Sequence, residues 1–82
     1  DLAGVILNAG AYTHTSLALS DALELLSCPL MEVHLSDPKK REPIRRHSIV
    51  EPHAARVFAG AGLDGYRRAI EALAERLSLL NA

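Results

Sequence analysis

The sequence is poor in cysteine and aromatic residues and has no long apolar run, and each shortage excludes a class of protein. It contains one cysteine and no tryptophan, and aromatic residues make up 4% of its 82 residues. The single Cys28 cannot form a disulfide within the chain, which favours a reducing, cytoplasmic location. No apolar run approaches the ~20 residues of a membrane-spanning helix, so we expect no membrane partner.

The sequence also lacks an excess of charge of either sign. The formal net charge is −1, with the acidic residues spread along the chain, which argues against a general nucleic-acid or membrane-surface binder. Basic residues cluster only at Lys39, Lys40, Arg41, Arg45 and Arg46. Two interpretations of this cluster stay open: a solvated basic loop, or a site for an anionic small molecule, since arginine binds carboxylates in a bidentate manner.

What the chain does contain is a succession of short apolar segments. Residues 3–7 and 56–60 are typical of buried strands in a parallel sheet, and residues 30–35 predict a third strand. A helix opens at residues 13–16, where a threonine can cap its first turn, and a second helix begins near Leu63. The order of these segments, β-α-β-β-α, predicts an α/β fold with a parallel sheet.

Each predicted helix carries one apolar stripe that would pack on the sheet. Before the second helix, Gly60, Gly62 and Gly65 do not form a dinucleotide-binding fingerprint and are predicted to allow close helix–sheet packing. Three strands and two helices cannot cover both faces and both edges of a sheet, so residues 1–82 are expected to form a single partial domain. The stripe residues are Leu19, Ala22, Leu23 and Leu26 in the first helix and Leu63, Tyr66, Ile70, Leu73, Leu77 and Leu80 in the second.

The stretch L-M-E-V-H-L-S-D at residues 30–37 places two polar side chains in a strand. Strand residues alternate between faces, so Glu32 and His34 share one face, with α-carbons roughly 7 Å apart. A carboxylate at that distance can accept a hydrogen bond from an imidazole and set its tautomer. His34 also lies near the carboxyl end of the strand, where α/β sheets bind ligands. The alternative is a half-exposed strand whose polar face meets water.

For other polar residues, too, a structural interpretation stays open beside the functional one. Asn8 follows the first strand and offers a donor and an acceptor, but it is also a common turn residue. His14 lies near a helical first turn, where anions bind, or is simply solvated. Asp21 falls off the apolar stripe, where a solvated charge is the default. A metal site built from His14, His34 and His47 fits no zinc spacing.

Four motifs together resemble one known family. They are I-L-N-A-G-A-Y-T-H-T-S at residues 6–16, P-L-M-E-V-H-L-S at 29–36, R-E-P-I-R-R-H-S at 41–48 and G-A-G-L-D-G-Y-R-R-A-I at 60–70. In this order and spacing they resemble type II 3-dehydroquinate dehydratase over essentially the whole chain. The resemblance is to the carboxyl-terminal part of that enzyme, and it implies a flavodoxin-like parallel sheet of which this chain is the β-α-β-β-α portion.

The resemblance also implies an activity. Type II enzymes remove water from 3-dehydroquinate in a trans elimination that gives 3-dehydroshikimate through an enolate, without a metal, Schiff base or other cofactor. They act in the shikimate pathway, which leads to aromatic amino acids, and in quinate catabolism. By resemblance, His34 is the general acid that protonates the departing hydroxyl, Glu32 orients it, and Asn8 helps to stabilise the enolate oxygen.

The remaining roles that the resemblance implies concern binding. The backbone of Leu35 and Ser36, with the Ser36 hydroxyl, would hold the substrate carboxylate. His14 and Arg45 would bind ring hydroxyls, and Asp21 would reach the active site of a neighbouring subunit in a trimer-based assembly, commonly a dodecamer. Arg41 would support the lid from behind the site.

In the family the base is a tyrosine, assisted by a lid arginine, and both come from the amino-terminal half. Their motifs do not occur in these 82 residues, and Tyr12 and Tyr66 match other positions. We therefore expect activity only together with that half. The alternative is a catalytically inactive fragment that serves as an oligomerisation or small-anion-binding module.

Overall fold

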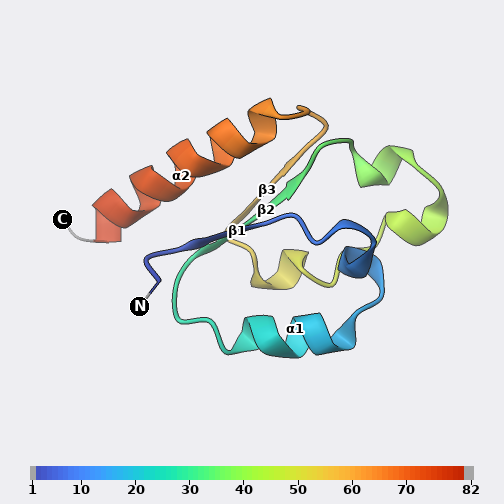
Figure 1. The fold of residues 1–82 in the computed structure, drawn as a ribbon, viewed down its shortest axis with the longest axis horizontal. Coiled ribbons are helices and arrows are strands. Elements are labelled where there is room, and N and C mark those ends of the chain that lie inside the picture. The colour runs from blue at the N-terminus through green and yellow to red at the C-terminus, as the bar shows by residue number, and fades with distance from the viewer. Residues whose placement is uncertain (1, 81–82) are drawn as a thin grey trace.

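The computed structural model describes residues 2–80, and within that range a parallel sheet lies between two helices (Figure 1). The strands β1 (Val5–Leu7), β2 (Leu30–His34) and β3 (Arg56–Ala59) are arranged in the order β1-β2-β3. Helix α1 (Leu17–Glu24) covers one face of the sheet and α2 (Asp64–Leu80) the other. The predicted α/β fold with a parallel sheet is confirmed.

The central strand β2 carries the two polar residues singled out in the sequence. Glu32 is in register with Leu7 of β1 and Val57 of β3, and His34 with Ala59. All five residues of β2 are buried, because neighbouring strands flank both edges and helices cover both faces. A half-exposed strand with a polar face in water was the alternative interpretation, and it is wrong: Glu32 is 1% exposed and His34 8%.

Two apolar clusters hold the layers together, one on each face of the sheet. Successive residues of β2 belong to alternate clusters: Met31 and Val33 face α2, and Leu30 faces α1. Glu32 and His34 follow Leu30 in steps of two and therefore belong to the face that α1 covers. The fully buried members are Met31, Val33 and Ala69 on the α2 side, and Leu23, Leu30 and Val50 on the α1 side.

The entry into α1 differs from the prediction. Residues Gly10–His14 form a 3-10 segment, and α1 begins only after it. The cap is Ser16, whose hydroxyl accepts a hydrogen bond from the backbone N–H of Leu19 at 3.1 Å. The predicted threonine cap is thus wrong. Thr13 instead belongs to the 3-10 segment, where it is fully buried, because the chain turns once before the helix starts.

Residues 56–60 were predicted to form a buried strand; the strand is confirmed as β3, but its predicted burial is wrong. In β3 only Phe58 is half-buried, and Val57 is 39% exposed. The reason is that β3 forms one edge of the sheet among the described residues, so α2 packs over only part of its surface. The guanidinium of Arg56 lies 4.7 Å from the centroid of the Phe58 ring and covers part of it.

Helix α2 packs on the sheet through Tyr66 and Leu73 of the predicted stripe, together with the smaller Ala69 and Ala72. Leu63 and Ile70 are 77% and 57% exposed, whereas Ala69 is fully buried. The small side chain of Ala69 lets the helix approach the sheet closely, and Leu63 and Ile70 lie outside the contact. The predicted position Leu80 lies outside the side chains that the structure describes. None of the described helices is long and apolar enough to cross a membrane.

The three glycines before and in α2 have different roles. A Cβ atom on Gly65 would lie 3.4 Å from Cγ1 of Val33, so this glycine permits close helix–sheet packing as predicted. Gly60 and Gly62 instead have φ angles of +82° and +59°, a left-handed backbone that other residues adopt only with strain. They turn the chain from β3 into α2, and the Gly62 N–H donates to the Leu35 carbonyl at 2.9 Å.

Candidate active site

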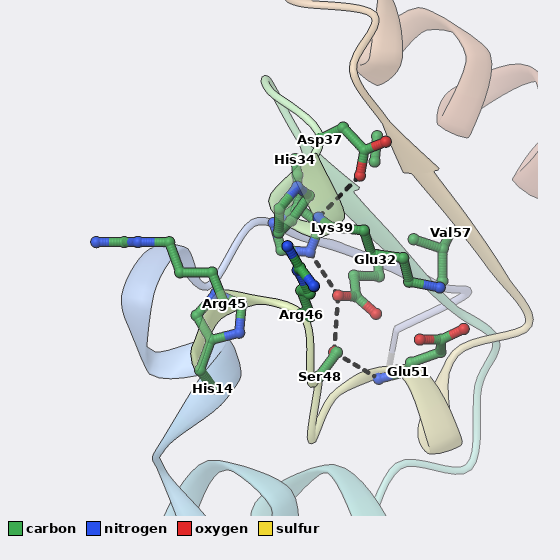
Figure 2. Close-up of a pocket in the computed structure, with 12 residues that line it drawn as sticks. His14, Glu32, His34, Asp37, Lys39, Arg45, Arg46, Ser48, Glu51 and Val57 are labelled. Carbon is green, nitrogen blue, oxygen red and sulfur yellow. Dashed lines mark hydrogen bonds and ion pairs between the residues drawn. The ribbon is translucent and has the colours of Figure 1, made fainter. Parts of the chain in front are cut away.

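Two adjoining cavities open at the carboxyl ends of the strands. They measure about 310 and 190 Å³, and His14, His34, Pro38 and Arg45 line both. The larger extends toward β3, past Glu32, Ser48 and Val57 (Figure 2). The smaller gathers most of the residues that the sequence singled out. They are Asn8, His14, His34, Leu35, Ser36, Arg41 and Arg45.

The centre of the site is a buried histidine–carboxylate pair. Nε2 of His34 lies 2.5 Å from Oε2 of Glu32, as Figure 2 shows by the dashed line between them. An ionised carboxylate only accepts hydrogen bonds, so Nε2 carries a proton and donates it. The second ring nitrogen, Nδ1, then accepts a hydrogen bond when the ring is neutral and donates one when the ring is charged. The contact thus orients His34 for proton transfer through Nδ1.

A third side chain contacts the same carboxylate oxygen. The Ser48 hydroxyl donates to Oε2 of Glu32 at 2.9 Å, although the two residues are far apart in the sequence. The other carboxylate oxygen, Oε1, is buried and has no hydrogen-bond partner among the described residues. Glu32 is consequently held through one oxygen by two donors, one on each side.

The tautomer of His14 is also set by a neighbour. Its Nδ1 lies 2.7 Å from the backbone carbonyl oxygen of His47. A carbonyl oxygen only accepts, so Nδ1 donates and Nε2 is left for a ligand. A neutral His14 therefore presents an acceptor at Nε2, as needed for contact with a substrate hydroxyl.

The Asn8 side chain is oriented by two contacts. Its Oδ1 accepts from the backbone N–H of Gly10 at 3.1 Å, and its Nδ2 lies 3.1 Å from the hydroxyl of Tyr66. Because a backbone N–H requires an acceptor, the first contact assigns the oxygen and the nitrogen of the amide. Tyr66, in α2, therefore accepts a hydrogen bond from the Asn8 amide and helps to fix its orientation. Sequence reasoning missed this role, because the two residues are separated by 58 positions.

The basic loop forms one wall of the site. The Arg45 side chain is 32% exposed and forms an ion pair with Glu42, to which Arg41 is also close at 3.9 Å. Hydrogen bonds from its own backbone and from Arg45 lower the pKa of Glu42. The basic loop therefore pairs with a carboxylate of its own, that of Glu42. Arg45 also lines both cavities, together with His14 and His34.

Asp21 lies apart from the other site residues. It is exposed on α1 and does not belong to the lining of either cavity. Within one chain the structure thus does not bring it to the site. In residues 2–80, no three histidine, cysteine, aspartate or glutamate side chains are grouped so that they could hold a metal ion, and the ring of His14 is engaged with the backbone of His47.

These features define a class of protein. An open parallel α/β sheet carries a buried histidine–carboxylate pair at the carboxyl end of its central strand, beside a cavity with two arginines. That end of the sheet is where α/β proteins bind small-molecule ligands. The combination is typical of an enzyme that transfers protons to or from a small anionic substrate.

Comparison with known proteins identifies the family. The sequence profile described as dehydroquinase class II matches residues 1–74. The 3-dehydroquinate dehydratase 2 of Ralstonia nicotianae is 52% identical over 73 residues, which cover 89% of this chain and 47% of that protein. The 3-dehydroquinate dehydratase of Mycobacterium bovis is 53% identical over 73 residues, which cover 89% and 50%.

Solved structures agree with the sequence comparison. The type II dehydroquinase from Propionibacterium acnes superimposes with a TM-score of 0.84 at 42% identity, over 88% of this chain and 53% of that one. The type II dehydroquinase from Butyrivibrio crossotus gives 0.82 at 44% identity, over 85% and 49%. The chain belongs to the dehydroquinase class II family, so the family and the flavodoxin-like fold inferred from the four motifs are confirmed. It spans about half the length of the curated relatives it matches.

Proposed function

We propose that this chain is the carboxyl-terminal part of a 3-dehydroquinate dehydratase. The reaction removes the proton α to the ketone of 3-dehydroquinate and the hydroxyl β to it, as one water, and leaves the enone 3-dehydroshikimate. The observation that carries the proposal is the His34–Glu32 pair, buried at the carboxyl end of β2. Relatives that match most of the chain are named for this activity.

His34 serves as the general acid in this proposal. Its Nε2–H is held by Glu32, so the proton that reaches the departing hydroxyl comes from Nδ1 of the charged ring. General acid catalysis by a positioned side chain accelerates a reaction by about 10²–10⁴-fold. Glu32 is a positioning residue, because its carboxylate contacts His34 and Ser48 within the fold.

The other cavity residues bind the substrate and stabilise the enolate. Asn8, held by Gly10 and Tyr66, supports the negative charge that develops on the ketone oxygen. Leu35 and Ser36 follow His34 directly and line the smaller cavity, where they would hold the substrate carboxylate. His14 and Arg45 line the same wall and would bind ring hydroxyls, with Arg41 behind them.

The base that takes the α-proton lies outside this set. Tyr66 is engaged with Asn8, and Tyr12 is 70% exposed and does not belong to the lining of either cavity. We propose that a tyrosine and a lid arginine from an amino-terminal half complete the site. No metal or other cofactor takes part in the proposed chemistry.

We also propose a homo-oligomer built from trimers, such as a dodecamer, in which Asp21 completes a neighbour's site. The outer surface of α1 supports this arrangement. Leu17 and Leu25, four residues before and after Asp21, are 73% and 86% exposed, and Ala18 and Ala22 beside them are exposed as well. Burying such a surface against another subunit removes apolar area from water, and it would carry Asp21 into the interface.

A dehydration assay tests the proposal, with the enone absorbance of the product as the signal. The protein is assayed alone and with an amino-terminal half added, for instance that of the Ralstonia nicotianae relative. Turnover in either sample that disappears in the His34→Ala variant is the expected result. Turnover that persists in the variant would remove His34 from the mechanism.

The absence of turnover in both samples would favour the second candidate function, a small-anion-binding or oligomerisation module. The basic loop beside the cavities is the feature that favours it, since Lys39, Arg45 and Arg46 all line the larger cavity. A cytoplasmic location, expected from the single Cys28, stays a prediction that cell fractionation tests.

A further inference from the structure

The Ser48 hydroxyl forms hydrogen bonds with three groups of the protein. It accepts hydrogen bonds from the backbone N–H groups of Val50 at 3.1 Å and Glu51 at 3.0 Å. It also contacts Oε2 of Glu32 at 2.9 Å, and that oxygen in turn contacts Nε2 of His34 at 2.5 Å. Figure 2 shows the line of contacts that runs from the Glu51 backbone through Ser48 and Glu32 to His34.

The direction of each bond follows from the number of donors and acceptors. A serine hydroxyl has one proton and two lone pairs. The N–H groups of Val50 and Glu51 use both lone pairs, so the only remaining partner for the Glu32 carboxylate is the hydroxyl proton. Ser48 must therefore donate to Glu32. Its contact with the carboxylate is charge-assisted and stronger than a neutral one.

The segment that carries Ser48 is itself held firmly. The backbone N–H of Ile49 donates to the Thr13 carbonyl at 2.8 Å, and Val50 is fully buried in the cluster between α1 and the sheet. The position of the Ser48 hydroxyl is thus set by core packing, whereas a glutamate side chain alone has three flexible torsions. A fixed donor on a packed segment is what a catalytic pair needs to keep its geometry.

We propose that Ser48 is a positioning residue that locks the Glu32 carboxylate in the rotamer that orients His34. The kinetic consequence rests on the proposed dehydratase function; the structural consequence does not. Without the Ser48 hydroxyl, the Glu32 carboxylate keeps a single hydrogen-bond donor, His34. The two side chains can then change their torsion angles together while their mutual contact persists. His34 then spends less time in the geometry that delivers its proton. This lowers kcat more than it raises KM, because the Ser48 hydroxyl uses its proton and both lone pairs on groups of the protein itself.

The test compares three variants of Ser48 in the intact protein. Ser48→Ala removes the hydroxyl, Ser48→Cys keeps a side chain of similar shape with only a weak donor, and Ser48→Thr keeps the hydroxyl. Loss of a hydrogen bond to a charged group predicts a fall in kcat of about 10- to 100-fold for alanine and cysteine, with KM changed less than about threefold. Threonine is expected to keep at least about a third of wild-type kcat.

A control isolates the effect of losing backbone contacts. Ser16→Ala also removes a half-buried hydroxyl that accepts a hydrogen bond from a backbone N–H, that of Leu19. Among the described residues, Ser16 forms no hydrogen bond with Glu32 or His34. This variant is expected to lower stability without a fall in kcat comparable to that of Ser48→Ala. A kcat equally low in both alanine variants would assign the effect to general loss of structure and overturn the proposal.

A spectroscopic measurement separates this inference from the proposed function. Nitrogen-15 and proton NMR of the His34 ring reports the proton between Nε2 and Glu32 without any substrate. In the wild-type protein this proton is expected far downfield and slow to exchange with solvent, and in Ser48→Cys its exchange is expected to accelerate about tenfold or more. An unchanged resonance and exchange rate in a folded Ser48→Cys protein would refute the positioning role even if the enzyme is active. A changed resonance in a protein that shows no dehydratase activity even with an amino-terminal half added would uphold the positioning role and refute the proposed function.

Discussion

Replacing His34 separates its chemical role from its structural one. His34→Ala removes both the proton donor and the partner of a carboxylate that is 1% exposed. His34→Gln also removes the acid, but a glutamine amide can still donate a hydrogen bond to Glu32. If His34 is the general acid, both variants lose kcat by about 10²–10⁴-fold. Only the alanine variant should also lose the contact that satisfies Glu32.

The size of the stability difference follows from the contacts of Oε2 of Glu32. It accepts from His34 at 2.5 Å and from Ser48 at 2.9 Å, so alanine halves its donors. A hydrogen bond to a charged group contributes about 1.5–3 kcal/mol. Water can enter the space left by the ring and replace part of that, so we expect His34→Ala to be about 2 kcal/mol less stable than His34→Gln.

The measurements are kcat from the enone absorbance and the free energy of unfolding from urea titration. His47→Ala is the matched control, because the His47 side chain is exposed and only its backbone carbonyl contacts His14; it should keep both quantities close to wild type. A His34→Gln variant with more than about a tenth of wild-type kcat would refute the acid role. Equal stability of the glutamine and alanine variants would refute the energetic importance of the contact with Glu32.

Three further predictions concern residues around the site. Arg45→Ala should raise KM about tenfold with little change in kcat, because a hydrogen-bonding cation is lost from the cavity wall; an unchanged KM in steady-state kinetics would exclude that role. Asp21→Ala should lower kcat only in the oligomer, checked by light scattering alongside the assay, and a fully active monomer would contradict the shared site. Hydrogen bonds from Arg67, then Arg68, lower the pKa of Asp64 below its usual 3.8. The ionised Asp64 therefore contributes its full stabilisation above pH 3.8, and this stabilisation is lost as the pH falls through the pKa of the folded state. The stability difference between wild type and Asp64→Asn should therefore shrink in acid, and a difference independent of pH in urea titrations would show that the ion pairs contribute nothing.

The sequence predicted the layout of the sheet because its signals are local. The apolar runs and the two-residue alternation in residues 30–35 depend only on neighbours in the chain, and they placed Glu32 and His34 on one face correctly. In α2 the same reasoning was right for Tyr66 and Leu73, which pack on the sheet, and wrong for one adjacent position. The predicted stripe included Ile70, but Ala69 packs on the sheet, because the choice between adjacent faces depends on how closely the helix approaches.

The contacts around the His34–Glu32 pair were beyond sequence reasoning for the same reason, because they join segments that are remote in the chain. Ser48 reaches Glu32 across 16 positions and Tyr66 reaches Asn8 across 58, and neither pairing has a periodicity that a sequence can display. The burial of Glu32 and His34 also depends on segments that are remote in the sequence. The polar face of β2 is consistent with a strand in water when only the sequence is known, and only the packing of α1 and of the segment around Val50 removes it from water.

By itself, the sequence determined the order and type of the elements, the pairing of Glu32 with His34 on one strand face, and the family. These follow from chain-local periodicity and from residue motifs, which the amino-acid order contains in full. The tertiary structure alone decided that the pair is buried, that Nε2 of His34 faces the carboxylate, and that Ser48 is its third member. These three features depend on the distances between segments that are remote in the chain, and those distances are set only when the layers pack together.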